Sequence, residues 1–94
     1  MPTGSPPTWT VIWTREAMRS LRRLPARILP AVMSFAAERL ATNPLRTTHA
    51  LHEPLERYRS GTIGSFRILV EVDTQAATVY VVKVAYHADV YRPS

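Results

Sequence analysis

The residues best suited to chemistry lie in the second half of the chain. Guanidinium groups bind phosphates, an imidazole exchanges a proton near neutral pH, and a phenol can stack on a base or transfer a proton. The chain carries all three kinds of group in strand candidates and near its C-terminus: Arg57, Arg59, Arg67, Tyr86, His87 and Tyr91. These groups suit cleavage of RNA by its own 2′-OH, which needs an in-line strand, a stabilised phosphorane and proton transfer, but no metal. The alternative, in which Tyr91 packs at a strand end and the arginines are solvated, fits the sequence equally well.

No metal or cofactor is expected. His49, His52 and Glu53 form an H-x-x-H-E cluster, but it lies in a predicted loop beside Pro54, and ordinary loop histidines are the favoured interpretation. Walker, GxSxG and HExxH motifs are absent from the sequence. The chain has no cysteine, which excludes a disulfide scaffold, a thiolate nucleophile and a cysteine-ligated zinc site.

The charge balance predicts a polyanionic partner. The 94 residues include 12 basic and 7 acidic side chains, and Lys83 is the single lysine beside 11 arginines. The alternative is an arginine bias from GC-rich coding with solvated charges. No apolar run approaches the ~18 residues of a membrane span, and residues 1–7 are expected to be a flexible leader, not a signal peptide. Residues 8–94 are expected to form one domain, and a cytoplasmic location is permitted.

The first half of the chain predicts a strand and two helices. Thr8–Thr14 alternates as a half-buried strand does, and Thr14 is a suitable N-cap for a helix that ends near Pro25. Helical spacing places Ala17, Met18, Leu21 and Leu24 on one face of that helix, opposite Arg15, Arg19, Arg22 and Arg23. A second apolar helix is expected over Ala26–Ala41, and Pro30 means that it either starts near Leu29 or bends there.

Three strands are predicted in the second half, at Arg57–Thr62, Ser65–Asp73 and Thr78–Tyr86. The short connections between them require antiparallel neighbours. The predicted fold is therefore α+β, a small antiparallel sheet in the order βααβββ with the helical hairpin packed on one face. In such a sheet Arg67 shares a surface with one of Arg57 and Arg59.

The chain resembles the RelE/ParE superfamily of toxins from type II toxin–antitoxin modules, from Trp9 to Arg92. Four segments carry the resemblance: TREAMRSLRRLP (Thr14–Pro25), ATNPLR (Ala41–Arg46), GSFRILVEVD (Gly64–Asp73) and HADVYR (His87–Arg92). The resemblance implies the RelE-like βααβββ fold, a bacterial toxin, and a co-encoded antitoxin. The partner is expected to be acidic and partly disordered, and to fold on the toxin surface.

The RelE branch implies a ribosome-dependent mRNA interferase, which would bind the ribosome and mRNA. Its pattern maps catalytic roles onto Arg67, His87 and Tyr91. We assign RNA-binding roles to four further residues: Arg57, Arg59, Lys83 and Tyr86. The arginines of the first helix would then meet ribosomal RNA, or else form a solvated face.

The chain departs from that pattern at several positions. Ser60 and Thr62 stand where the family commonly has basic residues, and His87 replaces an arginine. Arg57 and Arg59 would substitute if the strand carried a bulge near Gly61. Two alternatives therefore stay open: a ParE-like inhibitor of DNA gyrase that does no catalysis, and a decayed toxin that keeps only antitoxin binding.

Overall fold

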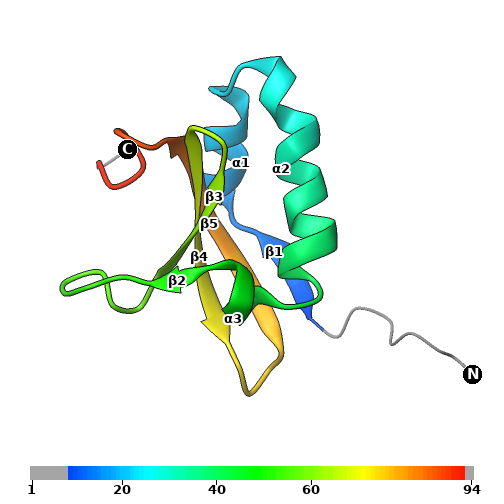
Figure 1. Ribbon diagram of the computed structural model, residues 1–94, viewed down its shortest axis with the longest axis vertical. Helices are drawn as coiled ribbons and strands as arrows, with labels where there is room; N and C mark the ends of the chain where they lie inside the picture. Colours follow the sequence, from blue (N-terminus) through cyan, green and yellow to red (C-terminus); the bar gives the residue numbers. More distant parts are fainter. Residues whose placement is uncertain (1–8, 93–94) are drawn as a thin grey trace, which may run out of the picture.

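The computed structural model describes residues 9–92, which form a five-stranded sheet with α1 and α2 on one face (Figure 1). The predicted leader and Thr8 lie outside the described residues. Within the described part, no helix is long and apolar enough to cross a bilayer. The predicted α+β class with a helical hairpin on one side of a sheet is confirmed.

The sheet has the order β1-β5-β4-β3-β2. Its strands are β1 (Thr10–Trp13), β2 (His49–Ala50), β3 (Arg59–Ile63), β4 (Phe66–Asp73) and β5 (Thr78–Tyr86). The last three strands are antiparallel neighbours, as their short connections predicted. The edge strand β1 instead pairs parallel to β5, which makes the sheet mixed. No short connection joins β1 to β5, so the rule that required antiparallel neighbours did not constrain this pair.

The helices begin and end for local reasons. The hydroxyl of Thr14 accepts the amide of Ala17 at 3.1 Å and caps α1 (Arg15–Arg22). A 3₁₀ turn, η1 (Ala26–Ile28), leads into α2 (Leu29–Phe35), which continues as a π-helical turn, η2 (Ala36–Leu40). Pro30 falls in the first turn of α2, where no intrahelical bond to its nitrogen is required. The helix therefore starts at Leu29, and Asn43 precedes a last short helix, α3 (Pro44–Thr47).

The core lies between the helices and the sheet. Its fully buried members include Ala17, Val32 and Leu40 from the helices and Ile68, Val70, Val79 and Val81 from the strands. The prediction that Met18 faces inward was wrong, because its side chain is 45% exposed. Ala17 and Ser20 are buried three residues apart, and Met18 lies about 100° around the helix from Ala17.

Candidate active site

Arg67 projects from β4 on the face of the sheet away from the helices. Its register partners are Thr62 on β3 and Ala85 on β5, whereas its neighbours Phe66 and Ile68 are buried on the helix side. The Arg67 Nη1 donates to the carbonyl oxygens of Gly64 at 3.1 Å and Phe66 at 3.0 Å. No carboxylate among residues 9–92 pairs with it. The guanidinium is thus held in place with its charge uncompensated.

His87 is fixed at the same end of the sheet as Arg67. Its backbone amide donates to the carbonyl oxygen of Ser65 at 2.9 Å, in the turn between β3 and β4. The ring of Tyr86 packs edge-on against Phe66 at 5.8 Å, and the His87 ring lies 4.4 Å from that of Tyr86. Tyr86 and His87 are both exposed. The backbone of His87 is therefore held at the turn that precedes Arg67. The Tyr86 ring lies with its register partner Phe66 on the helix side of the sheet, so the structure does not place it on the same face as Arg67.

Tyr91 belongs to the C-terminal segment, residues 87–92, which folds back on the side of the sheet away from α2 (Figure 1). The amide of Asp89 donates to the Tyr86 carbonyl at 2.8 Å, and that of Arg92 to the Asp89 carbonyl at 3.1 Å. Val90 is only 1% exposed, whereas Tyr91 is 47% exposed. Buried Val90 and the backbone bond of Arg92 therefore fix the segment before and after Tyr91, whose own side chain is exposed.

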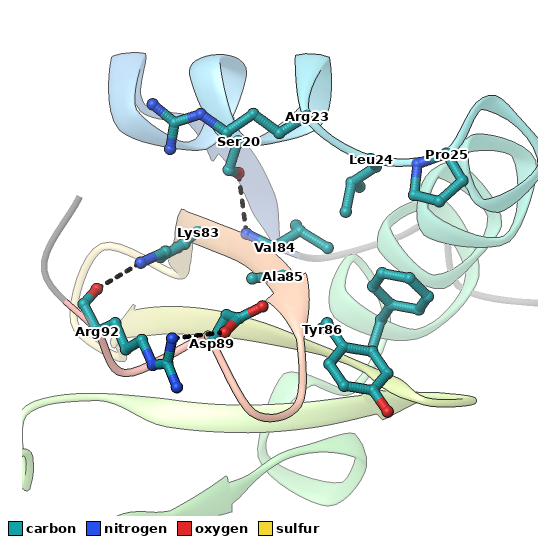
Figure 2. A pocket seen from close by; sticks show the side chains of 11 residues that line it. Ser20, Arg23, Leu24, Pro25, Lys83, Val84, Ala85, Tyr86, Asp89 and Arg92 are labelled. Atoms are coloured by element: carbon teal, nitrogen blue, oxygen red, sulfur yellow. Dashed lines mark hydrogen bonds and ion pairs between the residues drawn. The ribbon is translucent and has the colours of Figure 1, made fainter.

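Lys83 is buried and holds this segment through a hydrogen bond. It is 7% exposed, and its Nζ donates to the Arg92 carbonyl oxygen at 2.6 Å (Figure 2). Lys83 belongs to a row of three side chains on the face of the sheet that the helices do not cover. Its register partner Leu69 is 6% exposed, and Ser60, the register partner of Leu69 on β3, is fully buried. The ammonium of Lys83, predicted to bind RNA, is thus placed where it anchors the C-terminal segment over this row of the sheet.

Arg59 lies on the opposite face from Arg67. It is in register with Val70 of the core, and its Nε donates to Thr48 Oγ1 at 2.9 Å. Its Nη2 donates to the carbonyl oxygens of Thr48 at 2.8 Å and Leu45 at 3.1 Å. These bonds tie β3 to the end of α3, so the structure does not bring the Arg59 side chain to the candidate site.

Arg57 precedes β3 and pairs with Glu71, on the same face of β4 as Arg67. The Arg57 Nη2 lies 3.4 Å from Glu71 Oε1, and both side chains are substantially exposed. The bulge considered near Gly61 does not occur, since the β3–β4 register runs unbroken from Arg59 to Ile63. The irregularity falls instead between Leu69 and Val70, where β4 meets β5.

The positions beside Arg67 on β3 carry no base. Thr62 is its direct register partner, and Ser60 is buried with no hydrogen-bond partner for its hydroxyl among the described residues. His49 lies on β2 opposite Ser60. No group of three potential metal ligands gathers anywhere in residues 9–92.

Three residues that shape the site were not predicted from the sequence: Ser20, Asp89 and Arg92. Ser20 is buried in α1, where its hydroxyl donates to the Ala17 carbonyl at 2.8 Å and accepts the Val84 amide at 2.9 Å. Asp89 forms an ion pair with Arg92 at 3.3 Å. The i, i+3 spacing of Asp89 and Arg92 was a usable signal. Nothing in the sequence linked Ser20 to a strand 64 residues away.

Comparison with known families gives a match over residues 11–91 to the ParE toxin of the type II toxin–antitoxin system parDE. Toxin RelG of Mycobacterium tuberculosis is 39% identical over 84 residues, which cover 89% of this chain and 97% of RelG. Toxin RelE of the same organism is 32% identical over 79 residues, which cover 84% of this chain and 81% of that toxin.

Solved structures give the same result for the fold. The toxin–antitoxin complex RelBE2 from M. tuberculosis contains a chain with a TM-score of 0.81 and 38% identity, covering 87% of this chain and 94% of that one. The isolated E. coli RelE toxin matches with a TM-score of 0.67 over 83% of each chain. Its 14% identity supports a shared fold alone.

Proposed function

This chain belongs to the ParE toxin family of type II toxin–antitoxin systems, and we propose that it inhibits translation by cleaving mRNA on the ribosome. The observation that carries the proposal is the placement of Arg67 and His87 around the Gly64–Phe66 turn. An uncompensated guanidinium and an exposed imidazole carried by residues at the same turn are the groups needed for charge stabilisation and proton transfer at one phosphate.

The proposed reaction uses only RNA and side chains. The 2′-oxygen forms a bond to the adjacent phosphorus while the bond from phosphorus to the 5′-oxygen breaks, leaving a 2′,3′-cyclic phosphate and a 5′-OH. Arg67 stabilises the charge on the phosphorane, and His87 accepts or returns a proton. Tyr91 stacks on a base or takes the second proton-transfer role, since its phenol is 47% exposed.

The second candidate is inhibition of DNA gyrase without cleavage. The observation that favours it is the absence of a base at Thr62, in register with Arg67, and at the buried Ser60. In the first proposal the ribosome compensates for these missing basic residues. It orients the mRNA itself and so contributes part of the entropic advantage of positioning.

The antitoxin is the second proposed partner, with the toxin acting in the cytoplasm. The net charge of +5 favours an acidic chain that folds on contact. Solved neighbours that are toxin–antitoxin complexes, among them RelBE2 of M. tuberculosis, support such a partner for this chain.

Two assays run in parallel test the target. Purified protein is added to a cell-free translation reaction, where mRNA ends are mapped by primer extension, and to a gyrase supercoiling reaction. New mRNA ends that disappear with Arg67→Ala support the interferase. Intact mRNA with blocked supercoiling supports the gyrase inhibitor. If neither reaction changes while a co-encoded partner binds tightly, the chain is a decayed toxin.

A further inference from the structure

An open pocket of about 470 Å³ lies along the edge of β5 beside the candidate active site (Figure 2). β1 covers this edge only as far as Val81, and the end of α1 faces the edge beyond that point. The lining comes from α1 and the residues that follow it, from Phe66 of β4, from β5 and from the C-terminal segment. The members that matter here are Ser20, Arg23, Leu24, Lys83, Tyr86 and Arg92.

The edge of β5 inside this pocket is closed to an added strand. The amide of Val84 points away from β4 and is already bonded to the hydroxyl of Ser20 at 2.9 Å. A pairing strand would need that donor and the space that the end of α1 occupies. The pocket therefore suits a compact ligand and not an extended peptide backbone.

The pocket has a cationic end and an aromatic end. Figure 2 shows the charged groups of Arg23, Lys83 and Arg92 at one end, with Leu24 and Tyr86 toward the other. Asp89, which is paired with Arg92 at 3.3 Å, is the one carboxylate of the lining. Because three cationic side chains stand against it, the lining carries a net positive charge. Tyr86 is 45% exposed and its ring is held by Phe66, which makes it a fixed wall for stacking.

We propose that this pocket binds one nucleotide of the RNA, with its phosphate at Arg23 and its base against Tyr86 and Leu24. The identity of the ligand rests on the proposed RNA-cleaving function. Arg23 has left the helical stripe, because α1 ends at Arg22, and no carboxylate among the described residues pairs with it. Ala85, the register partner of Arg67, also lines the pocket, so the bound nucleotide would flank the one whose phosphate meets Arg67.

Arg19, on α1 four residues before Arg23, provides a matched control. Arg15, Arg19 and Arg22 line a different surface hollow with Trp13 and Met18 and take no part in the pocket. The predicted row of four arginines on α1 is thus divided, with only Arg23 turned to the β5 edge.

The test is a titration of ¹⁵N-labelled full-length protein with uridine and adenosine 5′-monophosphates, followed by amide chemical shifts. We expect saturable shifts at Ala85 and Tyr86. Arg23→Gln and Tyr86→Leu should each weaken binding at least about fivefold, and Arg19→Gln should leave it within twofold of wild type.

Three results would overturn the subsite. The first is no shift at the β5 edge, and the second is equal weakening by Arg23→Gln and Arg19→Gln. The third is the same shifts and affinity with inorganic phosphate alone or with a Glu-rich peptide, which would leave an anion site or a protein contact. If the nucleotides bind saturably but ribosome-bound mRNA stays intact in the translation assay, the cleavage proposal is wrong and the subsite stands. If the mRNA is cleaved but the nucleotides cause no such shifts, the cleavage proposal stands and the subsite is wrong.

Discussion

Arg67 and His87 are held by consecutive carbonyl groups of one turn. The guanidinium of Arg67 donates to Gly64 and Phe66 at 3.1 and 3.0 Å, and the amide of His87 donates to Ser65, between them, at 2.9 Å. These residues are 20 positions apart in the sequence, and the pairing of β4 with β5 brings them to the same turn. The turn therefore fixes the guanidinium of Arg67 and the backbone of His87 at the same end of the sheet.

Arg67→Ala should reduce cleavage of ribosome-bound mRNA by about 10²–10³-fold, the usual effect of removing one donor to a developing anion. Thermal unfolding should barely change, because the bonds of Arg67 go to carbonyls in an exposed turn. Single-turnover cleavage rates and melting curves measured on the same preparations check both. Arg57→Ala, which removes an exposed ion pair, is the control. Equal activity of the two variants would exclude Arg67 from the chemistry.

Lys83→Met should release the C-terminal segment while keeping the apolar stem. Loss of the buried bond to the Arg92 carbonyl should lower the free energy of unfolding by about 1–2 kcal/mol. Hydrogen exchange should accelerate at the amides of Asp89 and Arg92 far more than at Val81. Arg92→Ala keeps the carbonyl and removes only an exposed ion pair, so it should lower stability by less than about 0.5 kcal/mol. Unchanged exchange in Lys83→Met would show that Lys83 is no anchor.

Arg59→Met should destabilise the fold by about 1–3 kcal/mol, because three hydrogen bonds to Thr48 and Leu45 are lost. Arg57→Met should cost less than about 1 kcal/mol, since its partner is an exposed carboxylate. Urea denaturation of both variants measures the difference. A reversed order would mean that the bonds of Arg59 do not hold β3 to the α3 end.

Gly61→Ala should destabilise the protein by about 1–3 kcal/mol through crowding in the core. A Cβ at Gly61 would stand 2.7 Å from Phe35 Cζ, under α2. Gly64→Ala meets no atom within 4 Å but forces alanine into a φ of +58°, which should cost about 1 kcal/mol. Gly64→Asn should recover part of that loss, whereas Gly61→Ser should not. Denaturation midpoints of the four variants distinguish crowding from backbone strain.

The fold was largely predictable because its elements have local signals. Thr14 caps the first helix as expected, and the valine-rich run Thr78–Tyr86 predicts β5 with the observed bounds. The parallel pairing of β1 was not predictable in this way, because residues 78 and 10 meet through no short connection. The position of Met18 was predicted wrongly because helical spacing did not show which face of α1 contacts β5. That face carries Ala17 and Ser20, and Met18 lies to one side of it.

The site was only partly predictable. The antiparallel sheet predicted that Arg67 shares a surface with one of Arg57 and Arg59, and in the structure Arg57 reaches that face through its ion pair with Glu71. Alternation could not show that Lys83 would be buried, because the C-terminal segment that covers it has no regular structure. The division of the α1 arginines depends on where the helix ends, at Arg22, which spacing alone does not fix.

The most direct test uses ribosomes programmed with a 5′-labelled mRNA and an empty A site, under single-turnover conditions with excess protein. We predict one main cut, a 2′,3′-cyclic phosphate on the labelled fragment, and no cut when the attacking nucleotide is 2′-deoxy or when Arg67→Ala replaces wild type. Intact mRNA at saturating wild-type protein, or cutting that persists in the 2′-deoxy substrate, would contradict the account.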